Sequence, residues 1–276
     1  MDPEPPDPVA DITTWIVERA LATERTAIIG VHGPQGAGKS TLCARIVTAL
    51  AARDLRAVAL SIDDLYLTHA EQRALAAAHP GNRALEHRGY PGTHDVALGV
   101  RTLDALARRD HAEVAVPAYD KSAHAGRGDR HPEAAWPRVV TPLDVVLLEG
   151  WMLAFTAVPD ATVPEPDLAV PNRRLDDYAP WRARLDALIV LAVADGDLAH
   201  VVRWRVDAER QRRAAGAPGL SDEEARDYVE RFLPGYRLWD PALAARAPIA
   251  GPVLRIDVGP DRRPLVGWSR RSRSRA

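Results

Sequence analysis

The octapeptide GPQGAGKS at residues 33–40 constrains the fold of this chain more than any other feature. It matches the phosphate-binding pattern G-x-x-x-x-G-K-[ST], with an apolar run at residues 26–31 before it and a helical pattern at residues 39–52 after it. Glycines let backbone N–H groups turn toward phosphates, and the N-terminus of the next helix adds positive potential. The sequence therefore predicts an α/β fold in which a P-loop joins a buried strand to a helix.

Short apolar runs alternate with helical patterns along the chain, as in a parallel sheet flanked by helices. Buried strands are predicted at residues 26–31, 57–62, 145–148 and 188–193, and helices at residues 12–22, 39–52, 95–108, 198–214 and 221–232. The last helix opens on Ser221 and Glu224, which form a capping-box pattern. Two stretches rich in Pro, Gly and charge, residues 78–94 and 117–142, interrupt the alternation and are predicted to be functional loops.

The composition excludes several classes of protein. The 36 basic and 38 acidic residues nearly balance, which argues against a dedicated nucleic-acid or membrane-surface protein. The single cysteine, Cys43, rules out an intramolecular disulfide and fits a reducing cytoplasm. The start MDPEPPDPVA lacks a secretory signal pattern, and the longest apolar run, residues 187–194, is too short to span a bilayer. We expect a soluble, cytoplasmic, monomeric protein without specific nucleic-acid or membrane partners.

The P-loop residues have distinct expected roles. Lys39 reaches the β and γ phosphates, and the Ser40 hydroxyl can ligate Mg²⁺. The expected nucleotide contacts are Gly33, Pro34, Gln35, Gly36, Ala37, Gly38, Lys39, Ser40 and Thr41. Guanine-specific proteins of this class usually carry an Asn-Lys-x-Asp element, but the only other lysine of this chain, Lys121, follows Asp120. ATP is therefore the predicted nucleotide.

Acidic residues follow two of the predicted strands. Asp63 and Asp64 follow the second strand, and the carboxyl ends of parallel strands face the ligand crevice. Asp63 is nearer the strand and is the predicted catalytic carboxylate, which accepts or orients the proton of the acceptor hydroxyl. A turn cap explains Asp64 equally well. Glu149 follows the third strand and is expected to hold a Mg²⁺-bound water, so that Ser40, Asp63 and Glu149 form the predicted metal-linked set.

Several arginines fall within the segment predicted to be a lid, residues 197–220. They are Arg203, Arg205, Arg210, Arg212 and Arg213. Such a run is ordinarily a solvated face, but after a P-loop it also fits a mobile lid that closes on ATP and supplies charge to the transition state. Spacing does not decide which arginine acts, and Arg205 is the residue assigned to catalysis.

The two long loops are left to form the acceptor pocket. The predicted acceptor contacts are Asp63, Tyr66, Arg88, His94, Asp95, Tyr119, Lys121, Arg127 and Arg130, with Asp129 beside them. Cations for a carboxylate and acids for hydroxyls suit a small, anionic, polyhydroxy acceptor. We expect Lys121 to contact the acceptor or the phosphoryl group in transfer, and Arg127 or Arg130 to pair with the acceptor carboxylate. A salt-bridged surface is the alternative for these loops.

Seven strings between about residue 29 and residue 256 are together more specific than the P-loop alone: GPQGAGKS, SIDDLYLT, HPGNRALEHRGYPGTHD, VPAYDKSAHAGRGDR, VVLLEGWMLAF, WRVDAE and GLSDEEARDYVERFLPGY. Through these strings the chain resembles the plant-type D-glycerate 3-kinases, within the P-loop kinases that include uridine kinase, pantothenate kinase and phosphoribulokinase. The resemblance implies ATP-dependent phosphorylation of D-glycerate at its 3-hydroxyl to give 3-phosphoglycerate, and it supports Asp63 as the base and Glu149 as the Mg²⁺-linked acid. Thr93 stands where the family has Ser, a change that keeps the hydroxyl. Two other departures, Tyr90-Pro91 and the arginine-rich helix after Trp204, leave the acceptor identity open.

The expected organisation is one P-loop kinase domain with flanking segments. An N-terminal segment and helix occupy residues 1–25, the kinase domain residues 26–258, with acceptor loops at about 78–142 and a helical lid at about 197–220, and a basic tail residues 259–276. The end of that tail, RRSRSRA, is expected to be disordered. The alternatives to a glycerate kinase are a kinase for another small hydroxy acid, sugar or pantothenate-like acceptor, a regulatory P-loop ATPase, and a nucleotide-binding scaffold without chemistry.

Overall fold

A six-stranded sheet forms the centre of the computed structural model, which describes residues 8–216, 219–265 and 269–271. Its strands run in the order β10-β9-β8-β1-β7-β2. They are β1 (Ala27–His32), β2 (Ala57–Ser61), β7 (Val145–Gly150), β8 (Ala187–Val193), β9 (Val253–Val258) and β10 (Ser269–Arg271). All neighbours pair in parallel except β9 and β10, which are antiparallel. The predicted parallel α/β sheet is confirmed, and β9 and β10 extend it beyond the predicted strands.

Position in the sheet explains the hydrophobic pattern of each strand. In β1, Ile29 pairs with Leu147 on one side and with Ala187 on the other, and every residue of the strand is buried. A strand enclosed in this way reads as a continuous apolar run. In β9, the polar residues Arg255 and Asp257 break the run and pair with each other, with Arg255 Nε donating to Asp257 Oδ1 at 2.9 Å. The hydrophobic pattern of β9 is therefore too weak to predict a strand from the sequence.

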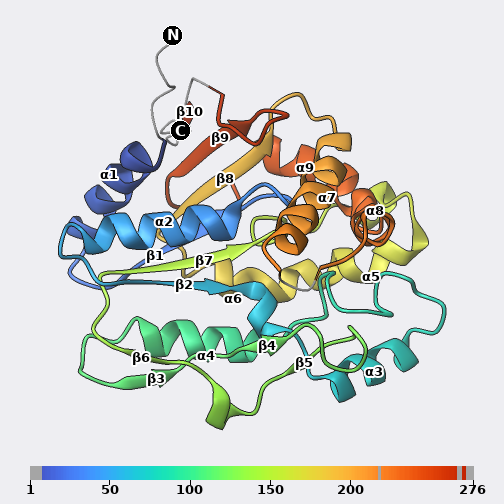
Figure 1. Cartoon of the computed structure of the whole chain (residues 1–276), viewed down its shortest axis with the longest axis horizontal. Coiled ribbons are helices and arrows are strands. Elements are labelled where there is room, and N and C mark those ends of the chain that lie inside the picture. Colours follow the sequence, from blue (N-terminus) through green and yellow to red (C-terminus); the bar gives the residue numbers. More distant parts are fainter. Residues whose placement is uncertain (1–7, 217–218, 266–268, 272–276) are drawn as a thin grey trace.

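Helices cover both faces of the sheet (Figure 1). On one face lie α1 (Pro8–Leu21) and α2 (Lys39–Ala51), and on the other lie α4 (Val96–Leu106) and α6 (Ala179–Arg182). Gly99 permits the close packing of α4 on α6, because a Cβ at this position would lie 2.5 Å from Trp181 Nε1. The helices α7 (Ala199–Ala214), α8 (Asp222–Glu230) and α9 (Leu233–Ala245) gather beyond the sheet, on the side of the P-loop (Figure 1).

The predicted helices all occur, with their ends shifted by a few residues. The capping box of Ser221 and Glu224 is confirmed. Beyond the prediction the structure has α3 (His69–Ala78), α5 (Pro166–Arg174), α6 and α9. Pro171 lies inside α5 and Pro241 inside α9, and internal prolines hide a helical pattern. No helix among the residues described is long and apolar enough to cross a membrane.

The second of the two predicted loops needs a correction. Residues 79–94 contain no helix or strand, as expected. Within residues 117–142, however, β4 (Tyr119–Asp120) pairs with β5 (Asp129–Arg130), and β6 (Arg138–Val140) pairs with β3 (Glu113–Ala115). The segment that carries Lys121 is thus the turn of a short hairpin, called here the β4–β5 hairpin.

The chain ends also differ from expectation. Arg270 and Arg271, the first residues of the string RRSRSRA, belong to β10, so the prediction of disorder is wrong for them. Residues 272–276 of that string lie outside the described residues, as do residues 1–7 of the predicted N-terminal segment and residues 217–218 of the predicted lid. The domain limits at residues 26 and 258 stay a prediction. Residues of α1, such as Ile12 and Ile16, belong to the same hydrophobic core, and β10 pairs with β9 in the same sheet.

Candidate active site

The P-loop lies at the carboxyl end of β1 and is held from behind by two helices. Gly36 and Gly38 have φ angles of 78° and 88°, which residues with a Cβ rarely adopt. A Cβ on Gly36 would lie 2.7 Å from the backbone carbon of Trp204, so α7 packs directly against the loop. From α9, the Tyr236 hydroxyl accepts a hydrogen bond from the Gln35 backbone N–H at 3.2 Å and donates one to the Gln35 side chain.

Lys39 and Ser40 begin α2 and meet an acid from the neighbouring strand. Lys39 Nζ donates to the Pro34 carbonyl at 3.0 Å, so its side chain folds over its own loop. Burial lowers the pKa of Lys39, although the carboxylates of Glu149 and Asp63 act in the opposite direction. Ser40 Oγ donates to Glu149 Oε1 at 2.9 Å, and Glu149 is buried at the end of β7. An ammonium, a hydroxyl and a carboxylate thus converge at the phosphate loop.

The Ser40 hydroxyl and the Glu149 carboxylate are a donor set that suits Mg²⁺. This ion prefers hard oxygen ligands, and it is usually held by one or two protein groups with waters and substrate phosphates. Within the described residues, no three His, Cys, Asp or Glu side chains cluster as an all-protein metal site requires. A Mg²⁺ ion at this position would take the rest of its ligands from phosphate oxygens and water.

Asp63 lies in the turn Ile62–Leu65 that follows β2, and two side chains hold its carboxylate. The Tyr66 hydroxyl donates to Oδ1 at 2.9 Å, and Lys121 Nζ donates to Oδ2 at 2.6 Å. Burial alone would raise the pKa of Asp63, but the Lys121 charge and the two hydrogen bonds outweigh it and lower this pKa to about 2. Asp63 is therefore ionised at neutral pH, with an ammonium against it.

Asp64 has a different environment from its neighbour. Its Oδ1 accepts a hydrogen bond from the Tyr119 backbone N–H at 3.3 Å. Burial raises the pKa of Asp64 from 3.8 to about 6, against the lowering effect of Lys121. The two adjacent carboxyl groups therefore titrate in separate pH ranges.

We expect Asp64→Asn to stabilise the fold above pH 6 and to have little effect below pH 4. The folded state binds the Asp64 proton more tightly than the unfolded state, so the wild type loses stability as the pH rises from about 4 to about 6. A difference of about two pH units corresponds to about 3 kcal/mol at most. Asparagine does not ionise and can still accept from Tyr119 N–H. Thermal unfolding at pH 4 and pH 8 tests this, and the same change in Tm at both pH values would contradict it.

Three aromatic side chains pack against one another next to Asp63. Tyr119 packs edge-on against Tyr66 with 5.4 Å between ring centroids, and His94 stacks on Tyr66 at 4.4 Å. His94 Nδ1 is hydrogen-bonded to the Tyr178 hydroxyl at 2.9 Å, and burial lowers the pKa of His94 to about 3. Its Nε2 has no hydrogen-bond partner among the residues described. The predicted contacts Tyr66, His94 and Tyr119 thus form one wall next to Asp63.

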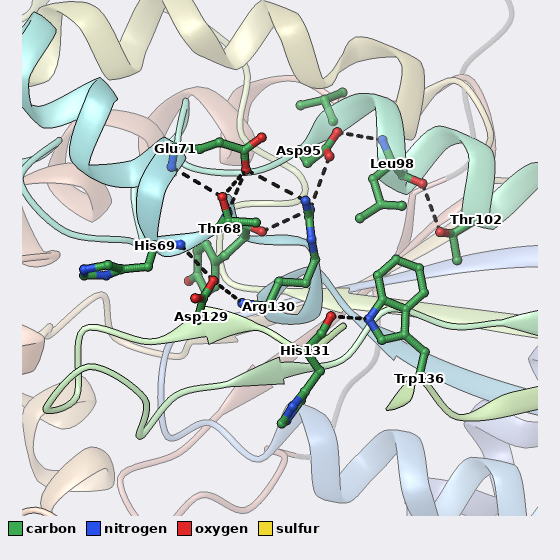
Figure 2. A network of polar contacts seen from close by, with 12 residues as sticks. Thr68, His69, Glu71, Asp95, Leu98, Thr102, Asp129, Arg130, His131 and Trp136 are labelled. Atoms are coloured by element: carbon green, nitrogen blue, oxygen red, sulfur yellow. Dashed lines mark hydrogen bonds and ion pairs between the residues drawn. The ribbon is translucent and has the colours of Figure 1, made fainter. Parts of the chain in front are cut away.

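The predicted acceptor cations are engaged with protein groups. Figure 2 shows the Arg130 guanidinium between Asp95 and Glu71, with N···O distances of 3.2 and 3.8 Å. Arg127 is exposed and hydrogen-bonded to His87. The Arg88 guanidinium donates to backbone carbonyls of the β4–β5 hairpin. Arg130 therefore takes part in salt bridges, as in the alternative considered for these loops.

Asp95 and Arg130 border a cavity of about 650 Å³ between α4 and the strand β5 (Figure 2). Its walls also include Thr68, Leu98, Arg101, Thr102, His131 and Trp136. Lys39, Asp63 and Lys121 do not line this cavity. The predicted acceptor contacts thus lie in three places: around Asp63, around the cavity, and, for Arg88 and Arg127, at the turn of the β4–β5 hairpin.

The arginines of the predicted lid contact α8 and residues of α7 itself. Arg205 Nη2 pairs with Glu209 Oε1 at 2.6 Å, and its guanidinium lies 4.9 Å from the Tyr228 ring centre. Arg210 and Arg213 both pair with Asp222 at the start of α8, and Arg203 contacts His200. Arg205 is the lid arginine whose backbone lies against the P-loop, since its N atom is 2.8 Å from a Cβ built on Gly36.

Two tyrosines near the site have no place in the predicted set. Tyr236 contacts the P-loop through Gln35, and Tyr228 contributes to the electrostatic environment of Lys121 and Tyr66. Both lie in the string GLSDEEARDYVERFLPGY, which carries part of the family resemblance. The family resemblance of that string is the sequence feature that could have indicated these two tyrosines. No local spacing connects residues of α8 and α9 with the P-loop.

Comparisons with known proteins agree with this geometry. Residues 28–161 match the Phosphoribulokinase / Uridine kinase family. The chloroplastic D-glycerate 3-kinase of Arabidopsis thaliana is 40% identical over 247 residues, which cover 87% of this chain but 54%, about half, of that relative's length. The uncharacterized kinase mug58 of Schizosaccharomyces pombe is 35% identical, over 94% of this chain and 97% of the relative. The structure of a D-glycerate 3-kinase from Cryptococcus neoformans has a TM-score of 0.85 at 28% identity and covers 96% of this chain and 99% of its own.

Proposed function

Because this chain belongs to the D-glycerate 3-kinase family of P-loop kinases, we propose that it transfers the γ-phosphoryl group of ATP to the 3-hydroxyl of D-glycerate, giving 3-phosphoglycerate. The observation that carries this proposal is the Asp63 carboxylate, which is ionised and hydrogen-bonded to Lys121 and Tyr66 beside the P-loop. An anionic group there is suited to orient a hydroxyl acceptor toward a phosphate. The acceptor is therefore an alcohol, and the enzyme a phosphotransferase.

On the nucleotide side, residues 33–41 bind the phosphates of ATP. Backbone N–H groups of the loop and the N-terminus of α2 face the phosphate oxygens, and Lys39 leaves the Pro34 carbonyl to reach the β and γ phosphates. Ser40 and Glu149 are the residues that would hold Mg²⁺, which supplies charge neutralisation to the phosphates when bound. Arg205, whose backbone lies against Gly36, would add positive charge from the lid.

On the acceptor side, Asp63 orients the hydroxyl and receives its proton. Phosphoryl transfer passes through a loose transition state, so the proton leaves late and positioning contributes more than basicity. A carboxylate with a pKa of about 2 fits this role, because it stays ionised and is a weak base. Lys121, which donates to one oxygen of Asp63, would contact the acceptor or the phosphoryl group, while Tyr66 holds the other carboxylate oxygen.

The acceptor carboxylate needs a cation, and Arg127 is our candidate. It is exposed and on the same hairpin as Lys121, whereas Arg130 is paired with Asp95. His94 and Tyr119 would form the rest of the wall behind Asp63. Asp95 and Arg130, which border the cavity, would support this wall from the side of the cavity. We further propose residues 26–258 as the kinase domain, acting as a cytoplasmic monomer on a small molecule, without nucleic-acid or membrane partners.

An ATP-consumption assay with product identification tests the proposed function. We expect ADP release that depends on D-glycerate, with 3-phosphoglycerate as the product, and no comparable turnover with L-glycerate, pantothenate, uridine or ribulose 5-phosphate. Turnover with one of those compounds alone would assign another acceptor. Slow ATP hydrolysis that no acceptor changes would instead indicate a regulatory ATPase, and ATP binding without phosphate release a scaffold.

A further inference from the structure

We propose that Arg88 is a positioning residue, which places the Lys121 ammonium against Asp63 by fastening the backbone of the β4–β5 hairpin. The inference rests on the proposed function only in so far as it names the reaction that Lys121 serves. The charge of Arg88 first suggests that it binds the acceptor. In this assignment it does not contact the acceptor.

The contacts of Arg88 span the hairpin turn. Its Nη1 donates to the Gly126 carbonyl at 2.9 Å and also to the Arg127 carbonyl, while its Nη2 donates to the Lys121 carbonyl at 3.2 Å. One planar guanidinium therefore joins the residue that begins the turn to two residues near its end. The five donors of arginine in a fixed plane suit this geometry, and the single ammonium of lysine does not.

The strands of the hairpin cannot hold its shape by themselves. Each of its strands is two residues long, and isolated hairpins are marginally stable at best. Within the turn, Asp120 Oδ1 accepts hydrogen bonds from the Ser122 and Ala123 backbone N–H groups, and His124 Nε2 pairs with Asp129. Its turn also contains His124 and Ala125 with φ angles of 53° and 55°, a conformation unfavourable for residues with a Cβ. Arg88 adds contacts from outside the hairpin, including the one to the Lys121 carbonyl.

The packing around Gly128 shows how closely the guanidinium fits. A Cβ at Gly128 would lie 2.6 Å from Arg88 Nη1 and 2.5 Å from the Tyr119 ring. The Arg88 guanidinium also lies 5.5 Å from the centre of the Tyr119 ring, within the range of a cation–π contact. Because Tyr119 packs against Tyr66, Arg88 connects the hairpin to the wall behind Asp63.

Lys121 depends on this support because its own side chain is weakly held. The side chain is 57% exposed, and its ammonium makes its hydrogen bond to Asp63 at 2.6 Å from the end of a flexible stem. A long lysine side chain loses much rotamer freedom when it is ordered, so a fixed backbone origin favours the contact. Releasing the Lys121 carbonyl would free the backbone from which this side chain reaches Asp63, and so weaken the contact.

Two lysines in the whole chain make a direct measurement possible. With ¹³C-labelled lysine, the ε-carbon signals of Lys39 and Lys121 can be followed by NMR as the pH rises, and Lys121→Met assigns them. Burial alone would lower the pKa of Lys121, but the Asp63 carboxylate outweighs it and raises this pKa above its ordinary value. We expect Arg88→Gln to return the pKa of Lys121 toward that ordinary value. Arg83→Ala, an exposed arginine of the same loop, should not change it.

Kinetics with a double-mutant cycle complete the test. We expect Arg88→Gln to lower kcat/KM for the acceptor by roughly 10- to 100-fold with the KM for ATP nearly unchanged, and to have almost no further effect in a Lys121→Met background. The cycle uses whichever acceptor the wild type phosphorylates. If D-glycerate is not that acceptor, the assay of the wild type shows it, and the test of Arg88 is unaffected. An unchanged Lys121 titration in Arg88→Gln, or equal losses in both backgrounds, would overturn the proposal.

Discussion

Lys39→Ala should lower kcat by roughly 10³-fold while leaving the fold at least as stable as the wild type. The rate falls because the charge that develops on the β and γ phosphates loses its compensating ammonium. The stability does not fall, because burial already lowers the pKa of Lys39, which means that the folded protein disfavours a charge at this position. Lys39 thus supplies a charge that the reaction uses and that burial in the fold disfavours.

Steady-state kinetics and thermal unfolding of the same preparation separate the two effects. Arg45→Ala is the matched control, because it removes one positive charge from an exposed position on the same helix. The control should keep the wild-type rate. A Lys39→Ala variant with wild-type turnover would show that this loop does not serve a transferred phosphate.

Asp63→Asn should lower kcat by about 100-fold or more with little change in ATP affinity. Asparagine keeps the shape, but it does not accept a proton and leaves the Lys121 ammonium without its counter-ion. Since the pKa of Asp63 is about 2, the wild-type carboxylate is ionised throughout the range from pH 6 to pH 9, and the deficit of the variant should be constant over that range.

Asp64→Asn is the comparison variant for this experiment. It changes the adjacent carboxyl group, which accepts from the Tyr119 backbone and titrates near pH 6. The loss of kcat should be much smaller than for Asp63→Asn. The reverse result, with Asp64→Asn inactive and Asp63→Asn active, would transfer the catalytic role to Asp64.

The parts of the site that could be predicted are those encoded by consecutive residues. The P-loop has a fixed spacing within one turn, and Asp63 and Glu149 each follow a buried apolar run. Because the strands are parallel and adjacent in the sheet, their carboxyl ends bring these residues together without further information. The meeting of Ser40 with Glu149 follows from this topology.

The remaining features depend on tertiary contacts that leave no local pattern. Arg130, a predicted acceptor contact, forms a salt bridge with Asp95, and only the fold brings these two residues together. Arg88 was expected to bind a ligand because of its charge, yet its donors go to backbone carbonyls, which have no sequence signature. Tyr236 reaches the P-loop across 201 positions of sequence.

That last distance bears on the order in which the site can form during synthesis. The strand β1 is made early, but its neighbours β7 and β8 end at residues 150 and 193, and both edges of β1 stay unpaired until those strands have emerged from the ribosome. The contacts of the P-loop with Trp204 and Tyr236 form only after those residues have also been synthesised. A nascent chain therefore carries the complete phosphate-binding sequence long before it can form the loop, and ATP cannot assist folding until most of the chain is in place.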